Sequence, residues 1–427
     1  MCAGHIVLIT SGQPATNPRL VKEADLFTAN GYQVTVLYCY WNKWATLADQ
    51  QLMATRKWKL IQVAGSPAGA IAAYYKSKLL HKLAGYTARI SVNNKLSVYA
   101  LSRATLPLVR AASRIPADLY LAHNLAALPA AVIAARRNEA ISGFDAEDYH
   151  REETPASLAS IERRLKVRIE DTYIPQLDHF TTSSRDIAEL YEQHYHRRPM
   201  VIRNLLPKTT PLFTTVTALM QQATAIPHAT ASTNLLSPPV KLFWFSQSIG
   251  PNRGIELIID ALQYLAATNY ELHLLGDIKP GYLEQLHGLA SRNNIPLEKL
   301  HIHKPMEPEA LTRFSSTFDI GLASETGFCS NNEAALSNKL FTYIQAGLVV
   351  ILSDTKAQRQ FHNEHPSIGI CYKKDSSSML AQAIQHYINH REALADTKRA
   401  NYLLGQQLLN WEIECQLLLR KINRILS

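Results

Sequence analysis

The first 40 residues contain a strand–helix–strand pattern that leaves few folds open. The apolar runs at residues 5–10 and 32–38 predict two strands. Between them, residues 18–30 carry apolar side chains at helical spacing, with Asn17 as a suitable N-cap and Gly31 as a suitable C-terminal residue. Two strands joined by a helix pair in parallel through a right-handed crossover. The chain is therefore predicted to build a parallel α/β sheet.

The same alternation recurs along the chain and indicates two domains. Further strands are expected at 119–123, near 142–144, and at 179–184, 200–206, 241–247, 270–276, 319–324 and 348–354. Further helices are expected from 128, at 186–195, 255–266 and 338–346, and from 377 to 427 with a break near Gly405. A chain of 427 residues exceeds what a single core supports. We expect an N-terminal domain at 1–206, a linker rich in Thr, Ala and Pro at 207–239, a second domain at 240–404, and a C-terminal helix at 405–427 that returns to the first domain.

Composition excludes several classes of protein. Hydrophobic residues make up 47% and charged residues 19% of the chain, as in globular proteins, and no apolar run reaches the roughly 20 residues of a membrane span. The N-terminal residues lack the basic region of a signal peptide, so we expect a cytoplasmic protein. The five cysteines form no CxxC pair. The histidine pairs at 194 and 196 and at 301 and 303 lack neighbouring acidic or cysteine ligands, so we expect no metal site.

Positive charge is concentrated in one segment. Between Asp49 and Asp118 the chain has eleven basic residues and no acidic one, interleaved with aromatic and leucine side chains. Such a segment, at 56–114, suits an anionic membrane surface at the inner face of the plasma membrane or a polyanionic partner. An ordinary solvated helix face is the alternative. No nucleic-acid-binding motif accompanies the charge, so nucleic acid is not expected as a partner.

Two loops in the second half favour a phosphate ligand. Gly250, Arg253 and Gly254 precede the helix expected at 255–266, where free N–H groups and the helix dipole attract anions. Lys339 lies in the first turn of a helix capped by Ser337 or Asn338. A cation there opposes the helix dipole, which makes sense if a diphosphate binds. The spacing GxGxxG is absent, so a nicotinamide cofactor is not expected.

Several longer stretches resemble the GT-B glycosyltransferases, in particular family 4. The stretches SQSIGPNRGIELIIDAL and NKLFTYIQAGLVVILSD resemble the donor-binding domain of that family. TNPRLVKEADLFTANGYQVTVLY resembles its first βαβ unit, and DLYLAHNLAALPAA and ISGFDAEDYH resemble its following strands. The resemblance implies two doubly wound Rossmann-like domains facing across a cleft. It also implies sugar transfer from a nucleoside diphosphate sugar to an acceptor hydroxyl, without metal or another cofactor, and with retention of configuration.

The resemblance also assigns roles to residues. On the donor side, Arg253, Asn338 and Lys339 would contact the phosphates or sugar, with Gly250 in the same loop and Gly12 closing over the phosphates. His123 would approach the transferred sugar. On the acceptor side, the candidates are Gln13, Asn17, Arg19, Asn124 and His150. If transfer inverts the sugar, Glu147, Asp148 or His150 is the candidate base.

One position departs from the family pattern. Thr342 stands five residues before Gly347, where the family has a glutamate that binds the ribose. The Thr342 hydroxyl can accept one hydrogen bond from a donor ribose but cannot hold two ribose hydroxyls as a carboxylate does. Glu325 and Glu333 have the family's spacing but lie out of register, so Glu333 is an alternative ribose ligand. A nucleotide-sugar epimerase and a non-catalytic sugar-nucleotide-binding partner therefore stay open beside a transferase acting on a lipid-linked or cell-surface glycan.

Overall fold

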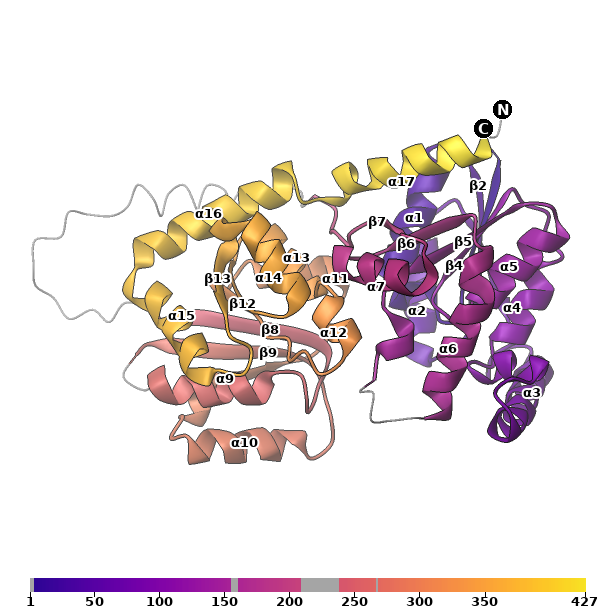
Figure 1. Ribbon diagram of the computed structural model, residues 1–427. Helices are drawn as coiled ribbons and strands as arrows, with labels where there is room; N and C mark the ends of the chain where they lie inside the picture. The colour runs from indigo at the N-terminus through magenta and orange to yellow at the C-terminus, as the bar shows by residue number, and fades with distance from the viewer. Residues whose placement is uncertain (1–3, 155–159, 209–237, 266–267) are drawn as a thin grey trace, which may run out of the picture. The chain divides into compact units, whose positions relative to one another are not determined.

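The computed structural model describes residues 4–154, 160–208, 238–265 and 268–427 (Figure 1). Two compact units divide the chain. The first, the N-terminal domain, comprises Met1–Arg203, Cys329–Asn331 and Cys415–Ser427, and the second, the C-terminal domain, comprises Asn204–Phe328 and Asn332–Glu414. Most of the linker expected at 207–239 lies outside the described residues.

The N-terminal domain contains a seven-stranded sheet in the order β3-β2-β1-β4-β5-β6-β7, in which all neighbouring pairs are parallel. The strands are β1 (His5–Thr10), β2 (Gln33–Cys39), β3 (Lys59–Val63), β4 (Leu119–His123), β5 (Ile141–Ala146), β6 (His179–Thr182) and β7 (Met200–Val201). The order reverses at β1, where the chain moves to β2 on one side and later to β4 on the other. The carboxyl ends of β1 and β4 are therefore the topological switch point, where open α/β sheets bind ligands.

Helices connect these strands. They are α1 (Pro18–Ala29), α2 (Lys43–Met53), α3 (Ile71–Ile90), α4 (Thr105–Ala112), α5 (Leu128–Arg137), α6 (Ile161–Tyr173) and α7 (Arg185–Tyr195), with a 3₁₀ segment at Lys95–Ala100. Helix α1 begins as the sequence predicts, because the Asn17 Oδ1 accepts a hydrogen bond from the Leu20 N–H at 3.1 Å and Pro18 is its first residue. Its apolar stripe, including Ala24 and Phe27, is fully buried.

The C-terminal domain has a six-stranded parallel sheet in the order β10-β9-β8-β11-β12-β13. Its strands are β8 (Val240–Ile249), β9 (Tyr270–Ile278), β10 (Leu300–His303), β11 (Ile320–Ala323), β12 (Val349–Ser353) and β13 (Gly369–Tyr372). Its helices are α9 (Ile255–Leu262), α10 (Tyr282–Arg292), α11 (Pro308–Ser315), α13 (Asn338–Ala346), α14 (Lys356–Glu364), α15 (Ser377–Asn389) and α16 (Arg391–Gln407). Helix α12 (Ser330–Ala334) has its first two residues in the N-terminal domain and the others in this one, and α17 (Trp411–Leu426) begins in this one.

Hydrophobic clusters lie on both faces of this second sheet. One cluster joins alternate strand residues such as Leu242 and Leu272 to α9, α10 and α15, and the other joins Phe243 and Leu275 to α13. Helix α16 is fixed by Asn401, whose buried Nδ2 donates to the carbonyl oxygens of residues 348 and 368 at 2.7 and 2.8 Å. The sheet is therefore doubly wound, as predicted.

The C-terminal helices differ in two details from the sequence prediction. His390 separates α15 from α16, a break that was not predicted. Helix α16 continues through Gly405, and the break falls at residues 408–410 instead. Helix α17 then carries Asn423, whose Oδ1 accepts a hydrogen bond from the Tyr32 hydroxyl of the N-terminal domain at 2.8 Å. Among the described residues, no helix combines the length and hydropathy needed to cross a bilayer.

Candidate active site

The turn between β8 and α9 presents a positive charge at a helix start. Arg253 is exposed, and its guanidinium donates one hydrogen bond to the Ser246 Oγ at 3.0 Å. Gly254, which follows, has a φ of +78° and directly precedes the eight residues of α9. A Cβ at Gly254 would lie 2.2 Å from the carbonyl oxygen of Ser324, so only glycine fits this approach of two loops. The backbone thus holds Arg253 beside the free N–H groups of α9.

Lys339, expected to bind phosphate, is already paired inside the C-terminal domain. Its ammonium lies 2.7 Å from the Glu325 carboxylate and 5.5 Å from the centre of the Trp244 ring. Burial alone would raise the pKa of Glu325, but the Lys339 ammonium and hydrogen bonds from neighbouring groups hold this pKa below its usual value. The pair gives the N-terminus of α13 a partly buried cation whose charge is balanced by a carboxylate. Both residues were noted in the sequence, but the ion pair between them could not be predicted from it.

The other residues predicted in α13 are tied to the helix. The Ser337 Oγ caps α13 by accepting from the Lys339 N–H at 3.3 Å, which settles the choice of cap. The Asn338 Oδ1 accepts from the Asn204 Nδ2 at 3.1 Å. The buried Thr342 donates its hydroxyl to the Asn338 carbonyl oxygen at 3.0 Å. This intrahelical bond differs from the expected contact with a ribose, and the donor role of Thr342 stays a prediction.

Glu333, the alternative ribose ligand, lies in the short helix α12. Its carboxylate pairs with the Lys374 ammonium and accepts from the Lys356 N–H at 3.0 Å. Since Lys356 is the first residue of α14, Glu333 serves as an acidic group at that helix start. Its role toward a ribose is likewise untested.

The N-terminal domain buries a network of charges at the carboxyl ends of β4 and β5. Arg19 of α1 donates to the two carboxylate oxygens of Asp145 at 2.5 and 2.7 Å and to the Ile202 carbonyl oxygen at 2.5 Å. The Thr181 hydroxyl donates to Asp145 at 2.7 Å. Arg19 and Asp145 are fully buried, and burial, which would raise the pKa of Asp145, is outweighed by the Arg19 charge that lowers it. Arg19 was expected to reach acceptor hydroxyls, whereas the structure buries it as a structural cation.

His123, at the end of β4, belongs to the same network. Its Nε2 lies 3.2 Å from the Glu23 carboxylate and its Nδ1 lies 3.5 Å from the Asp145 carboxylate. Burial would lower the pKa of His123, but the Glu23 and Asp145 charges raise it above the usual value. The ring is fully buried, so its placement differs from the expected contact with the transferred sugar. Glu23, which sequence reasoning missed, lies one helical turn after Arg19, and that spacing was the available signal.

Glu147, directly after β5, is the partly exposed member of this region. Burial, followed by the nearby Asp145 charge, raises its pKa to about 7. A carboxyl group with such a pKa can exchange a proton near neutral pH, which is the property required of a general acid or base. Glu147 is one of the three residues that the sequence offered as bases, and its pKa suits that role.

The raised pKa predicts a pH-dependent gain in stability for Glu147→Gln. The folded protein favours the protonated carboxyl of Glu147. The contribution of this group to the free energy of unfolding is therefore full below the ordinary pKa of 4.5 and is lost as the pH rises through about 7. The amide removes the unfavourable ionisation. At pH 8 the variant should exceed the parent in free energy of unfolding by on the order of 1–3 kcal/mol, and at pH 4 the two should agree. Urea unfolding at both pH values measures this, and a larger gain at pH 4 would contradict it.

The first loop is held by its own polar side chains. The buried Gln13 donates to the Asp49 carboxylate at 2.9 Å, and its Oε1 accepts from the backbone N–H groups of residues 41 and 42, both at 2.9 Å. The Gly12 carbonyl oxygen accepts a hydrogen bond from the Cys39 N–H at 3.1 Å. Asn124, with a φ of +100°, donates to the Thr10 hydroxyl at 2.9 Å. The loop after β1 is therefore braced against β2, α2 and β4. Gln13 and Asn17 make structural contacts, and their predicted ligand contacts stay predictions.

The remaining acceptor-side candidate, His150, and the candidate base Asp148 lie after β5. The buried His150 pairs with Glu153; burial would lower the pKa of His150, but the Glu153 charge raises it to about 9. A histidine that stays protonated at neutral pH cannot serve as a base there. Asp148 is half-buried, and its carbonyl oxygen accepts from the Tyr191 hydroxyl at 3.1 Å.

Comparison with known proteins identifies the fold. No protein-family model matches the chain, and no curated protein matches it by sequence. Among solved structures, Anabaena Alr3699/HepE in complex with UDP-glucose shares 16% identity, with a TM-score of 0.68 over 99% of this chain and 100% of that one. A glycosyltransferase from Rickettsia africae shares 11%, with a TM-score of 0.67 over 99% and 98%. WaaG, a glycosyltransferase of lipopolysaccharide biosynthesis, shares 13%, with a TM-score of 0.59 over 99% of both chains. The chain therefore has the GT-B fold, with two Rossmann-like domains.

Proposed function

We propose that this protein is a glycosyltransferase that moves a hexose from a uridine diphosphate sugar to an acceptor hydroxyl. The observation that carries the proposal is the full-length GT-B fold combined with Arg253 held at the start of α9. Structures of the same fold contain UDP and UDP-glucose. A diphosphate needs a fixed cation and unpaired backbone N–H groups, and the β8–α9 turn offers both in one place.

The chemistry follows from the leaving group. When the bond from the sugar to the diphosphate breaks, negative charge grows on the departing phosphate oxygens. A preorganised cation and helix terminus stabilise that charge without reorganisation. Arg253 would do this directly, whereas Lys339 would share its charge between Glu325 and the phosphate. Such electrostatic stabilisation requires no catalytic metal. A retaining transfer agrees with the burial of His123 and the protonation of His150, because it requires no strong enzymic base. If the transfer inverts the sugar, Glu147 is the candidate base.

A test with nucleotide sugars separates this activity from its alternatives. We expect UDP and UDP-glucose to raise the melting temperature of the full chain, and UDP to be released in the presence of a glycan acceptor. Incubation with the sugar nucleotide alone should leave the sugar unchanged. Appearance of an epimer without acceptor would instead indicate an epimerase, and binding without any turnover would indicate a non-catalytic partner.

Helix α3 supports a lipid-linked acceptor presented at a membrane. Its exposed apolar side chains recur every three or four residues along one stripe: Ile71, Tyr75, Leu79, Leu83, Tyr86 and Ile90, each more than half exposed. Exposed Lys76, Lys78 and Lys82 lie on the same helix. An amphipathic helix with basic residues, and with no acidic residue between positions 50 and 117, is suited to lie on an anionic lipid surface.

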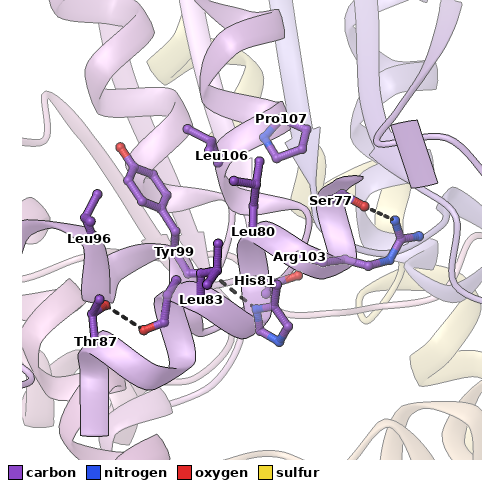
Figure 2. A pocket seen from close by; sticks show the side chains of 12 residues that line it. Ser77, Leu80, His81, Leu83, Thr87, Leu96, Tyr99, Arg103, Leu106 and Pro107 are labelled. Atoms are coloured by element: carbon purple, nitrogen blue, oxygen red, sulfur yellow. Dashed lines mark hydrogen bonds between the residues drawn. The ribbon is translucent and has the colours of Figure 1, made fainter. Parts of the chain in front are cut away.

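An apolar cavity lies behind this helix. Figure 2 shows Leu80, Leu83, Leu96, Leu106 and Pro107 around a cavity of about 180 Å³, with Tyr99 and Arg103 also in its lining. Arg103 is fixed by a hydrogen bond to the Ser77 hydroxyl at 3.0 Å. A cavity with apolar walls beside an exposed apolar helix could receive the lipid portion of an acceptor.

Charge reversal on α3 should weaken membrane binding. Each basic residue near an anionic surface contributes about 1 kcal/mol, so changing Lys76, Lys78 and Lys82 to Glu should reduce partitioning to vesicles of phosphatidylglycerol and phosphatidylcholine by at least roughly 100-fold. Vesicle sedimentation measures this. A matched control reverses three exposed lysines elsewhere, Lys304, Lys373 and Lys421. An equal loss in both variants would contradict a specific role for α3.

A further inference from the structure

Two neighbouring strands of the C-terminal domain place four metal-ligating side chains on one face. Glu271 and His273 lie two residues apart on β9, and His301 and His303 lie two residues apart on the edge strand β10. In the parallel register, His301 is opposite His273. Side chains two residues apart point to the same side of a strand, so all four share one face. The sequence shows only the His301–His303 pair, because its partners come from a strand that lies thirty residues earlier.

The side chains are close enough to share an ion. One ligand atom each from Glu271, His273 and His301 lies within 4.8 Å of the others. The His273 Nε2 lies 3.1 Å from a Glu271 carboxylate oxygen, and the His273 Nδ1 lies 3.0 Å from the His303 Nε2. Around a tetrahedral zinc ion, with bonds of about 2.0–2.1 Å, ligand atoms are about 3.3 Å apart. The separation of Glu271 and His273 is close to that value.

The hydrogen bonds within the cluster do not use the ring of His301. The His301 Nε2 is buried and has no hydrogen-bond partner among the described residues. Its ring stacks on that of His273, with centroids 4.4 Å apart. Burying a polar atom without a partner is unfavourable, so such an atom calls for an explanation. The two ring planes are 14° apart, so the His301 ring has to turn out of this stack for its Nε2 and a His273 nitrogen to bind one cation.

We propose that Glu271, His273 and His301 form a zinc site that joins β10 to β9. Two neutral imidazoles and one carboxylate are a donor set that zinc prefers, and a water molecule would complete the tetrahedron. The His273 Nδ1–H would then donate to the His303 Nε2, the contact that orients a metal-bound histidine. Phe314 and Phe318 contact the imidazole rings and form an apolar wall. The partly exposed Glu271 side chain leaves a route for the ion.

The site is separate from the proposed transfer chemistry. Glu271 and His273 lie in the amino-terminal half of β9, whereas Arg253 lies in a turn after the carboxyl end of β8. Strand β10 is the edge strand of the sheet. A metal ion bound by residues of both β9 and β10 would therefore stabilise the attachment of this strand to the sheet. The expected effect is on the stability of the C-terminal domain, and a transfer reaction without metal is compatible with it.

Metal titration of the untagged full chain tests the site. After chelation, one Zn²⁺ per chain should bind, and the melting temperature should rise with zinc concentration. Replacing zinc with Co²⁺ should give the visible absorption of a tetrahedral site. Glu271→Gln and His301→Gln should each abolish that spectrum and remove the zinc-dependent rise, whereas His303→Leu should weaken affinity by about 10- to 100-fold.

A matched variant controls for adventitious histidine binding. His287→Ala changes a half-buried histidine of the same domain, on α10, and should leave the spectrum and stoichiometry unchanged. Circular dichroism of each metal-free variant verifies that it is folded. The proposal is overturned if the parent gives no tetrahedral cobalt spectrum, or if folded Glu271→Gln and His301→Gln bind zinc as tightly as the parent.

Discussion

Changing Arg253 to alanine should lower kcat/KM for release of UDP from a sugar nucleotide by about 100- to 1000-fold, the loss typical for one preorganised group that stabilises a developing anion. The side chain is exposed and makes a single hydrogen bond to Ser246, so its removal should leave the fold intact. Arg253→Lys keeps the charge but not the planar donor geometry, and should therefore fall between the parent and the alanine variant. Initial rates over a range of donor concentrations measure the effect.

The control for Arg253 is Arg292→Ala. Arg292 is an exposed arginine at the end of α10 in the same domain, so its loss changes net charge equally but should leave kcat/KM within about twofold of the parent, since isolated surface charges have little effect. If Arg253→Ala retains the parent rate while the melting temperature still rises with UDP, the diphosphate binds elsewhere. A loss of the same size in Arg292→Ala would indicate a general charge effect.

Asp145→Asn should destabilise the N-terminal domain by about 3–5 kcal/mol, because it leaves the buried Arg19 without its main counter-charge. The amide keeps the size of the side chain, so the loss reports charge and not packing. Glu23 lies 3.8 Å from Arg19, and its carboxylate replaces only part of the negative charge that is lost with Asp145. Hydrogen exchange of the β1 and β4 amides measures the effect within this domain, where a whole-chain melting curve would mix two domains.

A surface ion pair in the same domain provides the comparison. Glu192 lies 2.7 Å from Arg198, and both side chains are more than 40% exposed. Glu192→Gln should change the exchange free energy of β1 and β4 by less than about 1 kcal/mol. If Asp145→Asn had as small an effect as this variant, the Arg19 guanidinium would have to reach solvent or another anion, and the buried network would not hold the domain together.

The sequence predicted the architecture well because strand and helix periodicities are local properties. The strand predicted at 5–10 agrees with the structure in full, and the helix predicted at 18–30 agrees to within one residue. Where tertiary contacts decide the extent of an element, the prediction from sequence was less accurate. The run predicted as a strand at 200–206 pairs only over Met200–Val201, because β-sheet pairing depends on a neighbour and not on apolar content alone.

The candidate site was predictable in part. The position of Arg253 at a helix start could be predicted because a glycine turn, an arginine and the first helical residue are adjacent in sequence. The burial of Arg19 could not, since its partner Asp145 lies 126 residues later and meets it only through the order of the strands. The pairing of Lys339 with Glu325 was hidden for the same reason. Contacts between loops that are distant in sequence thus decide which polar side chains are paired within the protein and which can contact a ligand.

The mutual dependence of Arg19 and Asp145 also limits how this chain can change over generations. Each residue is tolerable only while the other is present, so a descendant that replaces one must pass through a poorly folded intermediate or gain a compensating change first. Substitutions at these two positions should consequently be inherited together, and chains that carry neither charge should fill the space with apolar side chains of similar volume.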